Sequence, residues 1–294
     1  MPTEQPPSWR VILFTDEAFV VPAWAQLLAA VGHRLVAVVT SARRNPNYAA
    51  VVAAAGPDVE VLVSDRPRLW AAMLRPLRPD LLVSTSFPWR LPAELLDLPR
   101  LGAINLHAAL LPRYRGTDTL HWLFRNGERV GGVTMHRMAR DFDTGAILGQ
   151  VTVTIDDDDD EAALMGKIMQ ATPPLVLAGL ARIAQGEAGE PQDEAQASYY
   201  GKIADETAWK TIDWTRTARE VHNIVRSSSF ARQLPPGAVG TLNGTPHRIT
   251  KTRLLPETGA HGTPGTIISR SDAEIIVQCA DAPLAIVTYE PVAQ

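Results

Sequence analysis

The feature that most constrains the fold is a regular alternation over residues 9 to about 155. Short apolar runs alternate there with amphipathic segments rich in alanine and leucine. The apolar runs predict strands at 11–14, 34–40, 59–63, 81–83 and 103–104. The segments between them predict helices near 18–31, 47–55 and 66–76. Strands that are apolar on both faces and alternate with helices indicate a mostly parallel, Rossmann-like sheet flanked by helices.

The pattern changes after Gly132. Strands are predicted at 132–136 and 147–155 without a helix between them, and a long helix follows over about 161–185. Residues 187–198 are polar, acidic and without periodicity, which predicts a linker. A helix near 215–227 and five short runs separated by glycine, proline and asparagine then predict a small β-barrel of OB-like type or a sandwich. The chain is therefore expected to be an α/β protein of two domains, 1–190 and 205–294.

Composition removes several classes of function. Apolar residues make up 46% of the chain and charged residues 20%, with a formal net charge of -4, so no global charge attracts nucleic acid or an anionic membrane. A single cysteine, Cys279, excludes an internal disulfide framework and a cysteine-cluster metal site. The N-terminal residues lack the pattern of a secretory signal, and no apolar run is long enough to cross a membrane. We expect a cytoplasmic protein without a metal centre.

Three polar residues form a candidate proton-transfer site. Asn105 and His107 are two positions apart at the carboxyl end of a predicted strand, so their side chains point to the same side of the sheet. Parallel sheets bind their ligands at this edge. Asp143 lies in an acidic turn between two apolar strands. A strand-end histidine is more often a structural hydrogen-bonding group, so spacing alone leaves both interpretations open.

Two other patterns have structural explanations. The run of aspartates at 156–160 lacks the alternating spacing and turn glycine of a calcium loop, and it precedes a helix, so we interpret it as a solvated helix cap. The first predicted strand is followed by Thr15-Asp16-Glu17 rather than a glycine-rich turn, which argues against dinucleotide binding.

Ordered motifs between residues 101 and 145 resemble the formyltransferase family that uses 10-formyltetrahydrofolate. They are Ile104-Asn105-Leu106-His107, Leu110 to Gly116, Asn126-Gly127-Glu128, Gly132 to Met138, and Asp143-Thr144-Gly145. Ile212-Asp213-Trp214, Val221 to Arg226 and Pro236-Gly237-Ala238 resemble the carboxyl-terminal barrel of methionyl-tRNA and aminoarabinose formyltransferases. The resemblance implies a catalytic domain over 1–190 and a formyltransferase-type barrel over 205–294.

The resemblance implies roles for the three polar residues. An acceptor amine attacks the formyl carbon on N10 of the folate, and Asn105, with a protonated His107, could donate hydrogen bonds to the oxyanion. His107 or Asp143 could accept the proton that the amine loses. Asp143 could also orient His107. The division of acid and base roles between His107 and Asp143 stays open.

In this family the pterin ring lies against loop backbone. The matching stretches imply folate-binding positions at Phe87, Pro88, Trp89, Arg90 and Leu91, and at Arg140, Asp141 and Phe142. Packing beneath a loop is an equally good explanation for Phe87 and Trp89.

The acceptor is predicted from departures within the family. The loop at 41–48, where tRNA enzymes carry a basic insertion, is short, and the second domain is nearly charge-neutral, which disfavours tRNA. Arg115, Thr117 and Asp118 are candidate acceptor-binding residues, although Asp118 is equally well placed to cap a helix. His136 is expected to pack in the sheet and Arg226 to be solvated. The predicted function is N-formylation of a small-molecule amine, such as a nucleotide aminosugar or a siderophore intermediate, with methionyl-tRNA formylation as the alternative and formyltetrahydrofolate hydrolysis as a third, less favoured reading.

Overall fold

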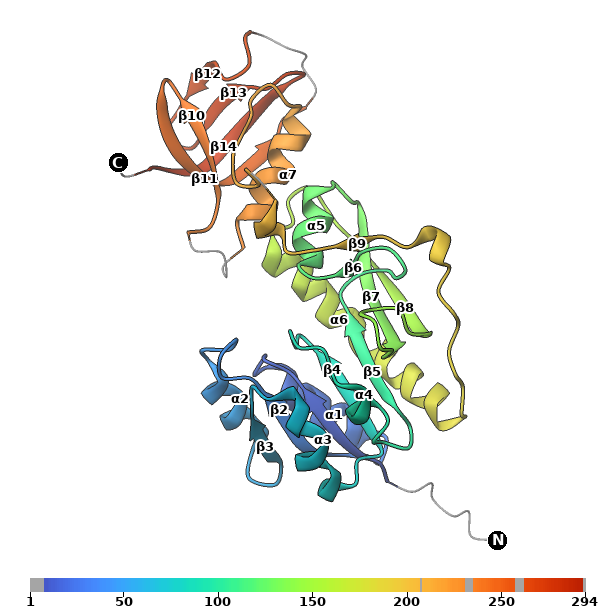
Figure 1. Cartoon of the computed structure of the whole chain (residues 1–294). Helices are drawn as coiled ribbons and strands as arrows, with labels where there is room; N and C mark the ends of the chain where they lie inside the picture. The colour runs from blue at the N-terminus through green and yellow to red at the C-terminus, as the bar shows by residue number, and fades with distance from the viewer. Residues whose placement is uncertain (1–7, 207, 231–234, 257–261, 293–294) are drawn as a thin grey trace. The chain divides into compact units, whose positions relative to one another are not determined.

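The computed structural model describes residues 8–206, 208–230, 235–256 and 262–292. Seven strands form one sheet in the order β3-β2-β1-β4-β5-β7-β8 (Figure 1). Their bounds are β1 Arg10–Phe14, β2 Arg34–Thr40, β3 Glu60–Val63, β4 Leu81–Thr85, β5 Ala103–His107, β7 Val130–Arg137 and β8 Ile147–Thr154. The first five strands pair in parallel, and β7 pairs antiparallel with β5. The predicted mostly parallel sheet is confirmed.

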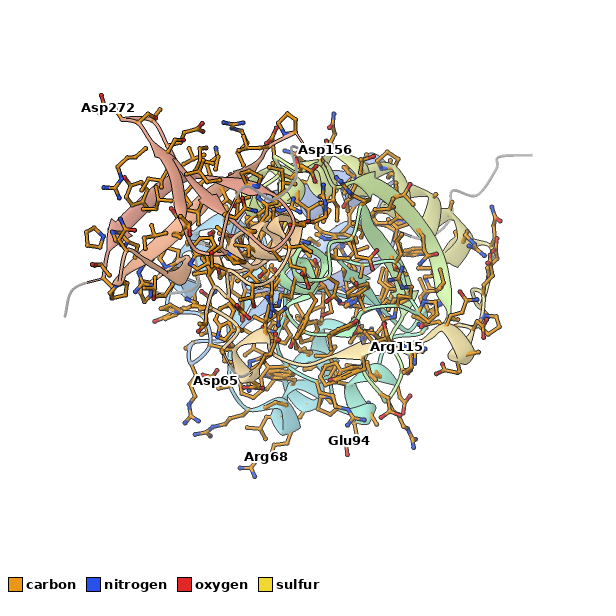
Figure 2. All side chains as sticks on the ribbon, turned by 90° about the horizontal axis from the view of Figure 1, so that it is seen from above. Asp65, Arg68, Glu94, Arg115, Asp156 and Asp272 are labelled. Atoms are coloured by element: carbon orange, nitrogen blue, oxygen red, sulfur yellow. The ribbon has the colours of Figure 1, made fainter. Side chains whose placement is uncertain are left out.

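Helices flank this sheet. They are α1 Val20–Ala30, α2 Tyr48–Ala55, α3 Pro67–Leu74 and α4 Ala93–Leu96. Buried residues of α3 and α4, among them Trp70 and Leu95, share one core cluster with Ile12 and Phe14 of β1. Their polar neighbours Arg68 and Glu94 extend into solvent (Figure 2). Because both faces of β1 are buried, the strand is a continuous apolar run rather than an alternating one.

The chain divides into two compact units that do not follow the sequence in two simple blocks. The first unit contains residues 1–115, 133–151 and 171–197, and the second contains 116–132, 152–170 and 198–294. Helix α5 (Thr119–Arg125) therefore belongs to the second unit, where it contacts α7 (Ala218–Ser228). The long helix α6 (Glu161–Ala184) contributes residues to both units.

The second unit contains a five-stranded antiparallel sheet in the order β10-β11-β14-β13-β12. Its strands are β10 Ala238–Leu242, β11 Thr245–Leu254, β12 Ile267–Arg270, β13 Ile275–Gln278 and β14 Pro283–Pro291. Helix α7 begins with a capping box, in which Thr217 and Glu220 each bond the other's backbone. Its buried residues Val221, Ile224 and Val225 join the core of the sheet. The small second β domain that the sequence predicts is confirmed.

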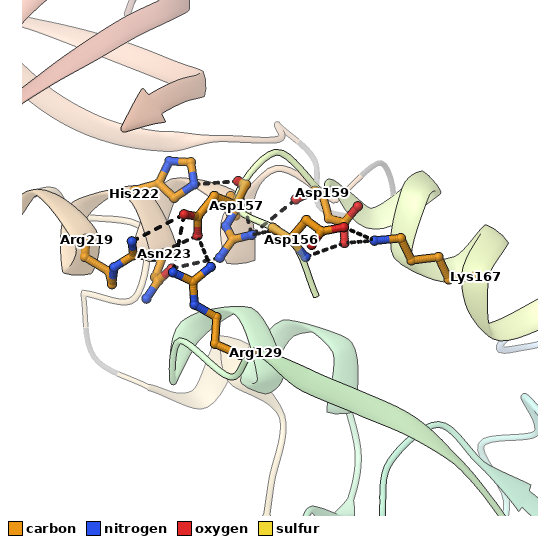
Figure 3. A network of polar contacts seen from close by, with 9 residues as sticks. Arg129, Asp156, Asp157, Asp159, Lys167, Arg219, His222 and Asn223 are labelled. Carbon is orange, nitrogen blue, oxygen red and sulfur yellow. Dashed lines mark hydrogen bonds and ion pairs between the residues drawn. The ribbon is translucent and has the colours of Figure 1, made fainter. Parts of the chain in front are cut away.

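Asp156, Asp157 and Asp159 of the aspartate run 156–160 are part of a network of polar contacts (Figure 3). Asp157 lies 2.5 Å from Arg129 and 2.7 Å from Arg219, and Asp159 lies 2.5 Å from Lys167. The Oδ1 of Asp160 accepts from the backbone N–H of Ala163 in the first turn of α6. The interpretation of this run as a helix cap is confirmed for Asp160. The ion pairs supply a structural reason for Asp156, Asp157 and Asp159.

Arg226 and His222 of α7 bind the backbone of the same loop. The Arg226 guanidinium donates to the carbonyl of Asp156 at 2.8 Å and lies over the ring of Phe124. The expectation that Arg226 is simply solvated is therefore wrong, since loop carbonyls and an aromatic face hold its side chain. His222 Nε2 donates to the carbonyl of Asp157 at 2.9 Å, while its Nδ1 lies 2.8 Å from the hydroxyl of Thr252.

Residues 187–198 are not a linker as the sequence predicts. Glu190 forms a β-bridge with Ile147, and its backbone exchanges two hydrogen bonds with that residue, at 2.7 and 2.8 Å. A short 3₁₀ turn follows at Glu194–Gln196. The polar composition predicts a linker, yet polar side chains of this segment form hydrogen bonds within the first unit. Strand β9 (Tyr199–Tyr200) directly follows this segment and pairs with the short strand β6 (Arg115–Gly116).

Two further observations concern function classes. No helix within the described residues has both the length and the apolar character needed to span a membrane. Among those same residues, no group of three or more histidine, cysteine, aspartate or glutamate side chains is placed to hold a metal ion.

Candidate active site

The site is built at the end of β5, where the parallel part of the sheet meets β7. Asn105 and His107 lie on β5, and Asn105 stands opposite His136 in the antiparallel register with β7. Asn105 Nδ2 is 3.2 Å from His136 Nε2. His136 Nδ1 is 2.8 Å from the carbonyl of Arg137, which can only accept, so His136 carries its proton on Nδ1. His136 Nε2 therefore accepts from Asn105, and this fixes the orientation of the Asn105 amide.

His107 is fixed in the opposite tautomer. Its Nε2 donates to the carbonyl of Tyr114 at 2.7 Å, so the lone pair of the neutral ring is on Nδ1. Nδ1 lies 3.6 Å from Asp143 Oδ1, and His136 Nε2 lies at the same distance from that oxygen. His107, His136 and Asp143 are 7%, 1% and 8% exposed. Asn105, His107 and Asp143, predicted from sequence as one site, are thus brought together in the first unit.

Burial sets the charge state of the imidazole. Removal from water lowers the pKa of His107, while the Asp143 carboxylate and the Tyr114 carbonyl act in the opposite direction. The neutral ring is favoured, and its Nδ1 lone pair faces the carboxylate. Such a pair can take up one proton and hold it between nitrogen and oxygen.

Asp143 lies in a strained turn between β7 and β8. Its φ is +57°, a left-handed conformation that is uncommon outside glycine. Two residues later, a Cβ added to Gly145 would overlap the carbonyl oxygen of Arg137. The turn is therefore held close against the end of β7, and this brings the Asp143 carboxylate to the two histidines.

The two predicted folate-binding stretches lie on neighbouring loops that contact each other. The Arg90 guanidinium donates to the carbonyl of Arg140 and forms an ion pair with Asp141 at 3.2 Å. The carbonyl of Pro88 accepts from Arg44. Phe142, next to Asp143, is 47% exposed. An exposed ring and loop backbone beside the buried trio are the kind of surface on which a flat heterocycle can bind.

Phe87, Trp89 and Leu91 of the predicted folate-binding stretch 87–91 pack against the hydrophobic core of the first unit. The ring of Phe87 lies 5.5 Å from Phe14, and Trp89 lies 6.2 Å from Trp70. Leu91 is 3% exposed in the same core cluster. The packing explanation for Phe87 and Trp89 is confirmed, and whether either side chain also contacts folate stays a prediction.

The three predicted acceptor-binding residues have different surroundings. Arg115 (Figure 2) is 7% exposed, and its guanidinium makes two hydrogen bonds to the Glu194 carboxylate at 2.7 and 2.8 Å. In the second unit, the backbone N–H of Thr117 donates to the carbonyl of Tyr200. Asp118 precedes α5 but its side chain makes no cap; its Oδ2 accepts from the backbone N–H of Ile203 at 3.0 Å. The helix-cap alternative for the Asp118 carboxylate is therefore wrong.

Sequence reasoning missed two residues of the site. His136 was expected only to pack in the sheet, but its ring also accepts a hydrogen bond from Asn105. It stands directly opposite Asn105, and this can be recognised only when the register between β5 and β7 is known. Gln192 donates to the carbonyls of Asp143 and Gly145. It lies in the supposed linker, and no local pattern marked it.

The sheet edge, the half-buried amide and the buried imidazole–carboxylate pair are an arrangement suited to an enzyme that transfers a group together with a proton. Comparisons of the sequence identify which one. Residues 63–178 match the model of the formyl transferase family, and residues 203–293 match the model of the formyl transferase C-terminal domain. The chain is 34% identical over 289 residues to methionyl-tRNA formyltransferase of Pelobacter propionicus, covering 95% of this chain and 88% of that protein. The chain belongs to the formyltransferase family and is an enzyme of that class.

Solved structures give the same fold at low sequence identity. WlaRD, a sugar 3N-formyl transferase solved in the presence of dTDP and 5-N-formyl-THF, superposes with a TM-score of 0.71 at 17% identity, over 98% of this chain and 100% of that one. HypX from Aquifex aeolicus, solved with tetrahydrofolic acid, superposes with a TM-score of 0.67 at 17% identity. That match includes 98% of this chain but only 45% of HypX.

Proposed function

We propose that this enzyme transfers the formyl group of 10-formyltetrahydrofolate to the amine of a small-molecule acceptor, such as a nucleotide-linked aminosugar or a siderophore intermediate. The observation that carries the transfer chemistry is the cluster of half-buried Asn105 with buried His107 and Asp143 at one sheet edge. The donor supplies the formyl carbon that the amine attacks. The loops at 86–91 and 140–143, bridged by Arg90, would hold its pterin ring.

Asn105 stabilises the charge that develops on the formyl oxygen. One of its two amide N–H groups is used on His136 Nε2, 3.2 Å away, and the other is the donor for the oxygen. Because His136 is itself fixed by the Arg137 carbonyl, the amide is oriented before the reaction begins. Preorganised donors of this kind contribute more than donors that must reorient.

His107 and Asp143 accept the proton that the amine loses. The His107 ring is neutral because burial lowers its pKa, and its Nδ1 lone pair is the basic atom. Asp143, 3.6 Å away, stabilises the imidazolium that forms. Nε2 stays bonded to the Tyr114 carbonyl throughout, so the ring does not rotate as it changes charge.

The small-molecule acceptor is supported by the loop after β2. Arg44, one of its two arginines, donates to the carbonyl of Pro88 at 2.8 Å and stacks on Trp89 with 4.4 Å between guanidinium carbon and ring centroid. Asn45 is buried and donates to the carbonyl of Asp16. The loop is thus anchored to the folate-side loop, which leaves it poorly suited to act as an RNA probe.

Methionyl-tRNA is the second candidate acceptor. The relative that shares 34% identity over 95% of this chain is a methionyl-tRNA formyltransferase, a far closer sequence match than the sugar formyltransferase at 17%. Hydrolysis of the donor is a third, less favoured outcome, since a water in place of the amine could use the same cluster.

One assay separates these functions. Tetrahydrofolate formation from 10-formyltetrahydrofolate is followed without acceptor, with initiator methionyl-tRNA, and with nucleotide aminosugars and hydroxylated ornithine. We expect turnover that depends on a small amine. Turnover with the tRNA alone would transfer the proposal to the second candidate, and turnover without any acceptor would identify a hydrolase.

A further inference from the structure

Gln192 holds the turn that carries Asp143. Its Nε2 donates to the carbonyl of Asp143 at 2.7 Å and to the carbonyl of Gly145 at 2.8 Å. Asp143 has a φ of +57°, in the left-handed region that residues other than glycine adopt infrequently. A residue in this conformation persists only where surrounding contacts fix it, and both amide hydrogens of Gln192 bond the two carbonyls of this turn.

The other end of the Gln192 amide is fixed by a buried guanidinium. Gln192 Oε1 accepts from Arg115 Nη2 at 2.7 Å and from Arg115 Nε at 3.1 Å. A guanidinium can only donate and a carbonyl can only accept, so this surrounding permits one orientation of the amide. Glu194 completes the set through its two hydrogen bonds to Arg115.

The same guanidinium connects the two halves of the proton-accepting pair. Arg115 directly follows Tyr114, whose carbonyl fixes His107 Nε2. The hydrogen bonds that Arg115 donates to Glu194 are the main cause that raises the pKa of Arg115, and the Asp143 carboxylate also contributes. Arg115 and Asp143 are therefore close enough for their charges to interact. A chain of contacts runs from the His107 loop through Arg115 and Gln192 to the Asp143 turn.

We infer that Gln192 is a positioning residue for formyl transfer: by joining Arg115 to the Asp143–Gly145 turn, it sets the distance between the Asp143 carboxylate and His107. The hydrogen bonds described for its side chain go to backbone carbonyls and a guanidinium, so it acts through Asp143 and not on the reacting atoms. The inference rests on the proposed catalytic role of Asp143.

The test is a double-mutant cycle on the full-length enzyme, with kcat and the KM for 10-formyltetrahydrofolate measured by tetrahydrofolate release. Gln192→Met keeps the length of the side chain and removes every hydrogen bond of the amide. We expect kcat to fall by about 10- to 100-fold, with KM changed less than about twofold, because a displaced group lowers the rate more than it weakens binding. Gln196→Met is the matched control, since that exposed glutamine bonds Asp193 alone among the contacts described for its side chain.

Combining Gln192→Met with Asp143→Asn tests whether Gln192 affects the rate through Asp143. If Gln192 acts through Asp143, Gln192→Met should lower kcat by less than about twofold in the Asp143→Asn background, measured in single turnover at high enzyme concentration. Equal losses in both backgrounds would overturn the inference, and so would an unchanged kcat in Gln192→Met itself. If Asp143→Asn alone leaves kcat unchanged, the proposed catalytic role fails instead.

A second substitution covers the case in which Gln192→Met does not fold. Gln192→Glu keeps an oxygen for Arg115 and replaces the amide donor by an acceptor that repels the two carbonyls. We expect the same loss of kcat at unchanged KM, and wild-type kcat in this variant would also overturn the inference.

Discussion

His107 is buried beside a carboxylate, and these two influences on an imidazole oppose each other. Removal from water lowers its pKa, and the nearby negative charge raises it; burial is the larger cause. The neutral form therefore persists to lower pH than for a histidine in water. A base of this kind accepts a proton at neutral pH without having first to lose one.

The pH dependence of the reaction follows from this. Activity requires neutral His107, so kcat/KM should fall as the pH drops through the lowered pKa, with a midpoint below the ordinary value of about 6.5. The profile is measured from pH 5 to 9 in the wild type and in His107→Gln. Any acid limb that remains in the variant belongs to the acceptor amine. A His107-dependent limb centred at or above 6.5 would contradict the assignment.

Asn105 is the second residue with a specific expectation. Asn105→Ala removes the proposed donor to the formyl oxygen, and the loss of one such donor lowers kcat by about 10²- to 10³-fold. Asn47→Ala serves as the control, because Asn47 is exposed and makes no side-chain cap at the start of α2. Steady-state tetrahydrofolate release measures both variants. A loss below tenfold in Asn105→Ala would remove this residue from the mechanism.

At the scale of elements, much of the first unit was predictable, and the reason is burial. Strands β1, β2 and β4 each contain a buried run of three or more consecutive apolar residues, and β5 begins with buried Ala103 and Ile104. The location of Asn105 and His107 at a strand end followed from the same pattern. What could not be predicted came from long-range pairing. His136 joins the site through the β5–β7 register, and Gln192 through a segment that is distant in sequence and has no periodic pattern.

The Asp143 turn should tolerate no side chain at its closest approach to β7. A Cβ at Gly145 would overlap the Arg137 carbonyl, so Gly145→Ala must displace the turn and with it Asp143. We expect a loss of at least about tenfold in kcat, since small displacements of reacting groups are costly. Gly166→Ala, in α6 with open space around its Cβ position, should keep full activity. Wild-type kcat in Gly145→Ala would contradict this account of the turn.

The stability of the second unit should depend on His222. Burial lowers the pKa of His222 to about 4, so the folded state binds its proton only in more acidic solution than the unfolded state does. The free energy of unfolding therefore keeps its full value, as far as His222 is concerned, above about pH 6.5 and decreases as the pH falls from there towards about 4. Between pH 7.5 and 5 we expect a decrease of about 2 kcal/mol. Urea unfolding at these two values should show a smaller pH difference in His222→Gln. Equal differences in variant and wild type would exclude His222 as a source.

At the scale of the whole molecule, the two compact units interleave along the chain. Helix α5 and the first half of α6 belong to the second unit, although both lie within the region that the sequence suggested for the first domain. Composition does not register that α5 contacts α7, so this interleaving could not be predicted from the sequence. The proposed reaction chemistry lies wholly in the first unit, through Asn105, His107, His136 and Asp143. The candidate acceptor residues Thr117 and Asp118 belong to the second.

The measurement that tests the central claim most directly follows the formyl group itself. 10-Formyltetrahydrofolate labelled with ¹³C in the formyl carbon is incubated with the enzyme and the acceptor panel, and mass spectrometry locates the label. The account predicts one labelled formyl group on the acceptor amine for each tetrahydrofolate released, with the yield at a fixed time strongly reduced in Asp143→Asn and retained in Asn47→Ala. Label released as free formate, or a full yield from Asp143→Asn, would contradict it.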